Sequence, residues 1–209
     1  MTMRSEDLTT EDKIVVFFDV CSSTTILEDL LSSGHLRTWR NVLIATKNFL
    51  RKSSAKNGMD IHKFIGDGWV LLFPTATSGE ALVKVLTGLA CFFHLQLKER
   101  IIPLLQSPPD VLGLTFGVDS GTIIRIMMLG RPEYIGRPLN VASRLQSAIK
   151  NNDEKPAYKV LFSKHTFHTL GLDDGTHPAE PVRRKLRNLF GGDNYHCMKL
   201  RLRIPAKCK

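Results

Sequence analysis

The sequence contains no long uninterrupted apolar run and no leader-like start. Its mean hydropathy is −0.07, and no hydrophobic segment approaches the roughly 20 residues that a transmembrane helix needs. The N-terminus is polar and lacks the apolar stretch behind a basic start that marks a secretory signal. These absences predict a cytoplasmic protein without a membrane span.

The sequence also lacks paired cysteines, internal repeats and linker-like segments. Without C-x-x-C spacing, we expect neither a zinc centre nor a disulfide framework, and we expect the cysteines to be thiols. A chain of 209 residues, 43% of them hydrophobic, suits one domain with a sizeable core. We assign residues 1–12 to an N-terminal tail and residues 13–209 to a single domain. The cysteines are Cys21, Cys91, Cys197 and Cys208.

Positive charge is in excess, and the excess is uneven. The net charge is +9, and residues 155–209 contain twelve Lys and Arg against four Asp and Glu. A solvated basic surface, or a basic surface that faces a polyphosphate, explains this excess of positive charge, and nucleic-acid binding is the alternative. Since aromatic residues are sparse there, we expect no nucleic-acid partner.

Hydrophobic periodicity predicts strands and helices in the order strand-helix-strand-strand-helix-strand. The order favours an α+β fold with a ferredoxin-like βαββαβ core, an antiparallel-rich sheet with helices on one face, and C-terminal strand additions. The expected helices are 22–57, interrupted near 32–34, then 76–99 and 139–150. The expected strands are 13–19, 59–65, 69–73, 111–118 and 122–129, with shorter ones near 158–162, 183–189 and 194–203.

Two carboxylates, Asp19 and Asp67, each follow an apolar strand and begin a polar turn. If the strands are neighbours, both side chains emerge at one edge of the sheet. Such a pair can hold divalent metal ions against a triphosphate. Ser22, Ser23 and Thr24 follow at the start of a helix, where free backbone amides bind phosphate oxygens.

A second polar pair lies in the segment GRPLNVASR, residues 136–144. Asn140 and Arg144 are four residues apart and share one face of a helix. They are either solvated surface residues or an amide that positions a sugar and a guanidinium that neutralises a phosphoryl transition state.

These motifs together resemble the catalytic domain of the class III nucleotidyl cyclases. The resemblance covers roughly residues 13 to 200, in matching order and spacing. It rests on residues 18–24 (FDVCSST), 63–68 (KFIGDG) and 136–144, with support from 116–121 (FGVDSG).

The resemblance implies two Mg²⁺ or Mn²⁺ ions, bound by Asp19, Asp67 and the carbonyl of Val20. One ion would activate the ribose 3′-hydroxyl, and the other would bind the triphosphate. Asn140 would orient the ribose, and Arg144 would stabilise charge on the α-phosphate. In such enzymes the metal pair and the Asn–Arg pair come from different protomers, so the resemblance implies a homodimer with shared sites.

Other substrate contacts are implied less directly. Arg187 would meet the terminal phosphates, with Lys185 as the alternative. Lys63 matches the family's base-recognising lysine, but its usual Asp or Thr partner is replaced by Glu133. A carboxylate acceptor suits cytosine N4 or uracil N3 as well as the adenine amine.

This departure favours a pyrimidine, UTP before CTP, with ATP as the alternative. The sequence shows no attached sensor segment, and in this it resembles the stand-alone bacterial cyclases that make cyclic UMP or cyclic CMP in anti-phage defence (Pycsar-like). A degenerate cyclase-homology module that only binds nucleotide is the non-enzymatic alternative.

Overall fold

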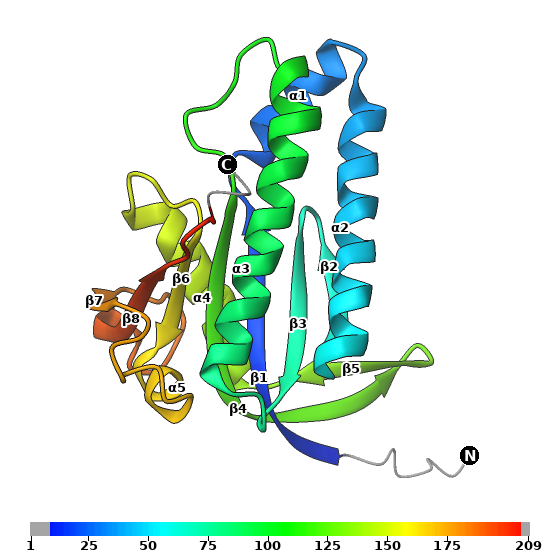
Figure 1. Cartoon of the computed structure of the whole chain (residues 1–209). Helices are drawn as coiled ribbons and strands as arrows, with labels where there is room; N and C mark the ends of the chain where they lie inside the picture. The colour runs from blue at the N-terminus through cyan, green and yellow to red at the C-terminus, as the bar shows by residue number, and fades with distance from the viewer. Residues whose placement is uncertain (1–8, 206–209) are drawn as a thin grey trace.

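The computed structural model describes residues 9–205 and contains an eight-stranded sheet (Figure 1). The strand order is β2-β3-β1-β4-β6-β8-β7, and β5 pairs with β4 outside this order. All pairs are antiparallel except β4 with β6, which confirms the predicted antiparallel-rich α+β fold. The strands are β1 (Thr9–Val20), β2 (Asp60–Ile65), β3 (Gly68–Pro74), β4 (Leu114–Met128), β5 (Arg131–Ile135), β6 (Lys159–Ser163), β7 (Ala179–Arg184) and β8 (Tyr195–Arg201).

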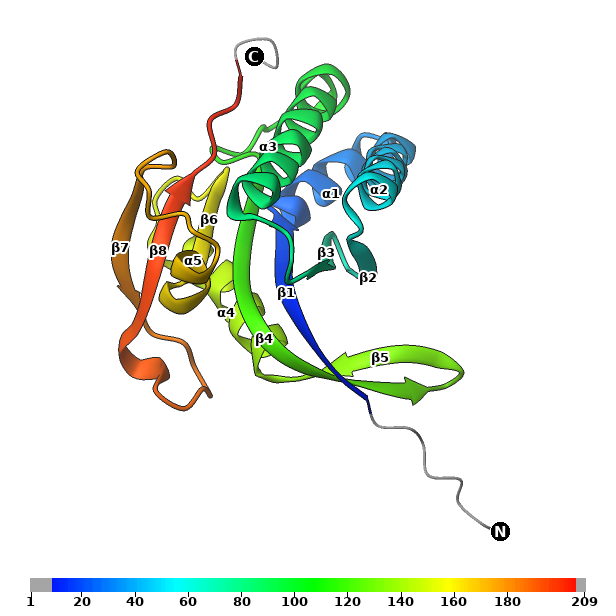
Figure 2. The same ribbon diagram turned by 60° about the horizontal axis from the view of Figure 1, so that its bottom comes forward.

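Helices cover both faces of the sheet, so the expectation of helices on one face is wrong (Figure 2). In β1, Val16 points into the main core with α1–α3, whereas Val15 points to the opposite face, which α4 covers. Both side chains are fully buried, as expected for a strand with two covered faces. The helices are α1 (Ser23–Ser32), α2 (Leu36–Asn57), α3 (Gly79–Gln96), α4 (Arg137–Asn152) and α5 (Lys164–Thr169).

The strands expected over 111–118 and 122–129 are one continuous strand, β4. The sequence Asp-Ser-Gly resembles a turn, but Asp119 is buried and accepts hydrogen bonds from the hydroxyls of Ser163 at 2.5 Å and Thr166 at 3.1 Å. Because these hydroxyls satisfy the carboxylate, the strand continues through it. Part of the loop expected over 130–138 forms β5, which pairs with the end of β4 as an antiparallel hairpin.

Other boundaries also differ from the predictions. Residues 9–12, which we assigned to the tail, belong to β1 and pair with β4. Strand β7 begins and ends earlier than the predicted 183–189, and the short helix α5 was not predicted. Cys91 is disulfide-bonded, so the expectation that it is a thiol is wrong. Cys21 and Cys197 are free and buried.

Helix α3 continues through a π-helical and a 3-10 segment as far as Leu104. By length and composition alone, Gly79–Leu104 is apolar enough to cross a membrane, contrary to the sequence expectation. Its buried side chains, among them Leu86 and Phe93, belong to the main core against the sheet. That packing is typical of a core helix.

Candidate active site

The fold brings the two predicted metal-binding carboxylates together. Asp19 lies near the end of β1, one residue beyond the Phe18–Trp69 pair, and Asp67 lies in the adjoining β2–β3 turn. Both line one open cavity of about 420 Å³, together with Ser143 and Gln146 of α4. The predicted meeting of the two side chains at one sheet edge is therefore observed.

Gly68 allows the turn to approach β1 closely. A Cβ at this position would lie 2.3 Å from the Phe18 carbonyl oxygen and 3.2 Å from Asp19 Oδ1. A larger residue would push Asp67 away from Asp19. The glycine of the Asp-Gly sequence thus allows this close approach because it lacks a side chain, in addition to favouring the turn.

The environment of Asp67 favours a cation. Its Oδ2 atom is buried and has no hydrogen-bond partner among the described residues. Burial raises the pKa of Asp67 and the Asp19 charge adds to the increase, whereas a hydrogen bond from the Ser23 side chain and the Lys150 charge oppose it. Buried polar atoms are normally paired, so an orphaned carboxylate oxygen beside a second carboxylate fits a metal ligand.

Helix α4 places two polar side chains on Asp19 that sequence reasoning missed. The Lys150 ammonium donates to Asp19 Oδ2 and, at 3.0 Å, to the Val20 carbonyl. Gln146 Nε2 donates to Thr115 Oγ1 at 2.8 Å and lies 3.4 Å from Asp19 Oδ2. The available signal was their i, i+4 spacing on the sheet-facing side of an amphipathic helix.

The described residues contain no group of three or more His, Cys, Asp and Glu side chains that could hold a metal. A divalent ion here would therefore depend on Asp19, Asp67 and the carbonyl of Val20. Oxygen ligands of this kind are those that Mg²⁺ and Mn²⁺ prefer, so the residues fit the implied metal.

The serine-rich start of α1 differs in detail from the predicted phosphate cradle. Ser22 has a positive φ of 56° and makes no side-chain cap. Its hydroxyl donates instead to the Val111 carbonyl at 2.8 Å. The Ser23 side chain lies where it lowers the pKa of Asp67, and Thr24 is exposed. Only backbone amides and Thr24 remain at this end of α1 for a phosphate.

Asn140, Arg144 and Arg187 lie together, apart from the cavity that Asp19 and Asp67 line. Arg144 Nε donates to the Arg187 carbonyl at 2.5 Å, and Nη1 donates to the Asn140 carbonyl at 3.1 Å. At 100° per residue, this pair lies roughly 80–160° around α4 from Gln146 and Lys150. Within the described chain, no hydrogen bond or ion pair joins Asn140 or Arg144 to the two carboxylates. Within one chain, the Asn140–Arg144 pair and the side chains that contact Asp19 therefore lie on different faces of α4.

The candidate base-recognising residues Lys63 and Glu133 meet although β2 and β5 are not paired. Lys63 Nζ lies 3.1 Å from Glu133 Oε1 and 3.0 Å from Oε2. The hydrogen bond from Lys63 lowers the pKa of Glu133. His62, which the sequence analysis did not single out, lies 3.6 Å from Glu133 Oε2 and packs edge-on against Tyr134. Burial lowers the pKa of His62.

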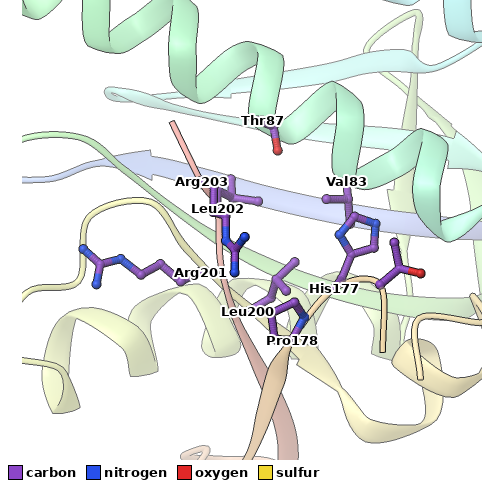
Figure 3. Close-up of a pocket in the computed structure, with 9 residues that line it drawn as sticks. Val83, Thr87, His177, Pro178, Leu200, Arg201, Leu202 and Arg203 are labelled. Carbon is purple, nitrogen blue, oxygen red and sulfur yellow. The ribbon is translucent and has the colours of Figure 1, made fainter. Parts of the chain in front are cut away.

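A second cavity of about 230 Å³ lies between α3 and β8. Figure 3 shows Val83 and Thr87 of α3 above it, with His177 and Arg203 at its sides. None of the predicted site residues lines this cavity, so it is separate from the carboxylate cavity.

No family model matches this sequence, and no curated protein matches it. Solved structures do resemble it. The adenylyl cyclase CyaB from P. aeruginosa has a TM-score of 0.71 at 18% identity, with 93% of this chain and 95% of that chain covered. The guanylyl cyclase Cya2 has a TM-score of 0.63 at 18% identity, with 95% and 96% covered.

A third similar structure is the catalytic core of a rhodopsin-guanylyl cyclase with converted specificity, in complex with ATPαS. Its TM-score is 0.62 at 16% identity, with 94% of this chain and 99% of that chain covered. The protein therefore has the fold of the adenylyl and guanylyl cyclase catalytic domains over nearly its whole length. At these identities the likeness establishes the fold, and the activity is a matter of proposal.

Proposed function

We propose that this protein is a metal-dependent nucleotidyl cyclase, which converts a nucleoside triphosphate into its 3′,5′-cyclic monophosphate and pyrophosphate. The observation that carries the proposal is the shared cavity of Asp19 and Asp67, in which one buried carboxylate oxygen has no partner among the described residues. The cyclase fold supports the same reaction class.

Asp19, Asp67 and the Val20 carbonyl would hold Mg²⁺ or Mn²⁺, two ions per site. Bound ions would supply a lowered pKa for the ribose 3′-hydroxyl and positive charge against the triphosphate. The 3′-oxygen would attack the α-phosphorus and lose its proton to solvent, while the bond from the α-phosphorus to the bridging oxygen breaks and pyrophosphate leaves. Arg144 stabilises the charge that develops on the α-phosphate.

The remaining polar residues would position the substrate. Asn140 orients the ribose, and Arg187 or Lys185 meets the terminal phosphates. Lys185 is already 3.4 Å from Asp193, whereas the Arg187 carbonyl touches Arg144, which favours Arg187. The amides at Ser22, Ser23 and Thr24 bind phosphate oxygens.

A homodimer with two shared sites would join the two halves that a single chain keeps apart. The β4–β5 hairpin supports this because it exposes apolar side chains along its length. Leu129 is 98% exposed, Met128 52% and Ile135 50%. Exposed apolar groups gathered on one projecting hairpin mark an interaction surface.

For the base, we propose a pyrimidine, UTP before CTP, with ATP as the alternative. The Lys63–Glu133 ion pair offers both a donor and an acceptor for the base edge. Glu133 is one methylene longer than Asp and narrows the space for a purine. The cyclic product would act as a cytoplasmic second messenger in antiviral defence.

We propose neither a nucleic-acid nor a membrane partner. Part of the C-terminal basic charge is already neutralised, since Asp153 pairs with Lys159 at 2.7 Å and Arg184 at 2.8 Å. Lys199 also pairs with Glu180 at 2.8 Å. Such internal pairs leave fewer cations to bind a phosphate backbone.

Incubating the protein with ATP, GTP, CTP and UTP separately, with Mn²⁺, tests the proposal. We expect a cyclic monophosphate, identified by mass, together with equimolar pyrophosphate, and the largest yield from UTP. Nucleotide binding without turnover of any of the four would instead indicate a binding module and overturn the proposed activity. A dominant cyclic AMP product would overturn only the pyrimidine assignment.

A further inference from the structure

Lys150 contacts two of the oxygens to which we assign the metal. Its ammonium group donates to Asp19 Oδ2 and, at 3.0 Å, to the backbone carbonyl of Val20. A lysine ammonium is a compact point charge with three donors. The singly charged ammonium group of Lys150 therefore lies at the place where the proposed function needs a divalent metal ion.

This contact differs from an isolated ion pair that fastens a helix to a sheet. Gln146, one turn before Lys150, already anchors α4 at this position through Thr115 at 2.8 Å. Lys150 also neutralises only part of the cavity, because Asp67 Oδ2 has no partner among the described residues. One ammonium thus faces two carboxylates, and the cavity keeps a net affinity for positive charge.

The ammonium and a divalent ion cannot bind the same oxygens at once. Mg²⁺ takes its oxygen ligands at about 2.0–2.1 Å, which leaves no room for an ammonium donating to the same carboxylate oxygen. Lys150 can move away, because its side chain is 32% exposed and has a flexible four-carbon stem.

We propose that Lys150 is an internal counter-ion that occupies part of the metal site and must be displaced before the site binds a divalent ion. It keeps the adjacent carboxylates of Asp19 and Asp67 together in the metal-free protein, and it lowers the affinity of the site for metal. The inference rests on the metal site of the proposed function.

The test measures Mn²⁺ binding by calorimetry to the full-length protein without nucleotide. Lys150→Met removes the charge at similar length, and Lys150→Gln is a second neutral variant in case the first does not fold. Lys84→Met on the exposed side of α3 makes the same change away from the site. We expect Mn²⁺ to bind about fivefold or more tightly to both Lys150 variants, with Lys84→Met unchanged.

Thermal unfolding gives a second readout that does not depend on activity. Without metal, Lys150→Met should melt below the wild type, because two carboxylates then face each other without a cation. Saturating Mn²⁺ should raise its melting temperature more than that of the wild type. A Kd within about twofold of wild type or weaker, with an equal thermal shift, overturns the inference.

The failure of the inference is distinguishable from failure of the proposed function. If wild type and variants all bind Mn²⁺ equally well, the metal site stands and the role of Lys150 is wrong. If neither wild type nor any variant binds Mn²⁺, the metal site itself is wrong, and both the inference and the proposed metal dependence are overturned.

Discussion

Replacing Gly117 with alanine should displace helix α4 from the sheet and disrupt the site at a distance. A Cβ at this position would lie 2.0 Å from the Ala142 carbonyl oxygen and 2.4 Å from the Gln146 backbone nitrogen. Both atoms belong to the α4 backbone, so no side-chain rotation relieves the overlap. Restoring ordinary contact requires α4 to move by roughly 1 Å or more in a close-packed interior.

The size of the effect follows from overpacking. Inserting a methyl group into a packed interface costs about 1–3 kcal/mol, and each kcal/mol lowers the melting temperature of a protein of this size by about 2–4 °C. We therefore expect a loss of about 2–12 °C. Since α4 also holds Asn140 and Arg144, a 1 Å misplacement should reduce cyclase activity about 100-fold.

Differential scanning calorimetry and a cyclase assay measure these losses. Gly88→Ala is the matched control, because its Cβ would meet only Phe49 Cζ at 3.7 Å inside helix α3. This control should be neutral or stabilising by about 0.4–1 kcal/mol. A Gly117→Ala variant with wild-type melting temperature and activity would refute the packing argument.

Three further predictions concern base recognition, buried charge and pH. Glu133→Gln should lower kcat/KM for the preferred triphosphate about 10- to 100-fold while leaving Mn²⁺ binding intact; an unchanged base preference across the four triphosphates would remove this residue from recognition. Asp153→Ala should lower the free energy of unfolding in urea by about 3–5 kcal/mol, because the Asp153 side chain is 5% exposed and lies within 3.6 Å of three cationic groups. The control Asp193→Ala, at a 93% exposed site, should change the free energy of unfolding by less than about 0.5 kcal/mol. Equal effects of the two substitutions would contradict the argument that burial makes the Asp153 ion pairs important. Burial raises the pKa of Asp119 above its ordinary 3.8, so its contribution to stability is full below pH 3.8 and is lost as pH rises through the folded pKa. Asp119→Asn should therefore lose more stability relative to wild type near about pH 4 than at about pH 8, and a pH-independent difference in unfolding free energy would disprove the sign.

The sequence predicted much of the fold because its apolar patterning is regular. The continuous apolar run within residues 13–19 and the Asp-Gly turn at 66–68 located most of β1 and the β2–β3 hairpin. The covered second face was missed, although Val15 and Val16 are adjacent and both buried. An uninterrupted apolar strand fits two covered faces, but periodicity alone does not say which helix covers each face.

The continuity of β4 could not be predicted from local signals. Asp119, Ser120 and Gly121 have turn chemistry, and only tertiary partners from β6 and α5 reverse that preference. Tertiary contacts of this kind override local propensity. The same limit applies to β5, whose pairing with β4 depends on a long hairpin that leaves the body of the sheet (Figure 2).

The candidate site shows a similar division. The approach of Asp19 and Asp67 followed from strand ends and a turn, which sequence reveals. Lys150 and His62 belong to no recognisable sequence motif, because the residues that they contact, Asp19 and Glu133, are distant in the chain. The divergence of Asn140 and Arg144 from the carboxylates depends on how α4 is rotated on the sheet, which is set by packing around Gly117.

The account depends most directly on the two carboxylates acting as metal ligands in catalysis. The decisive measurement is cyclic nucleotide formation by Asp67→Asn with Mn²⁺, compared with wild type and with Asp110→Asn at an exposed position. We predict a folded protein of unchanged oligomeric state whose activity falls by about 100-fold or more, with the exposed control unaffected. Activity near the wild-type level in Asp67→Asn would contradict the central claim.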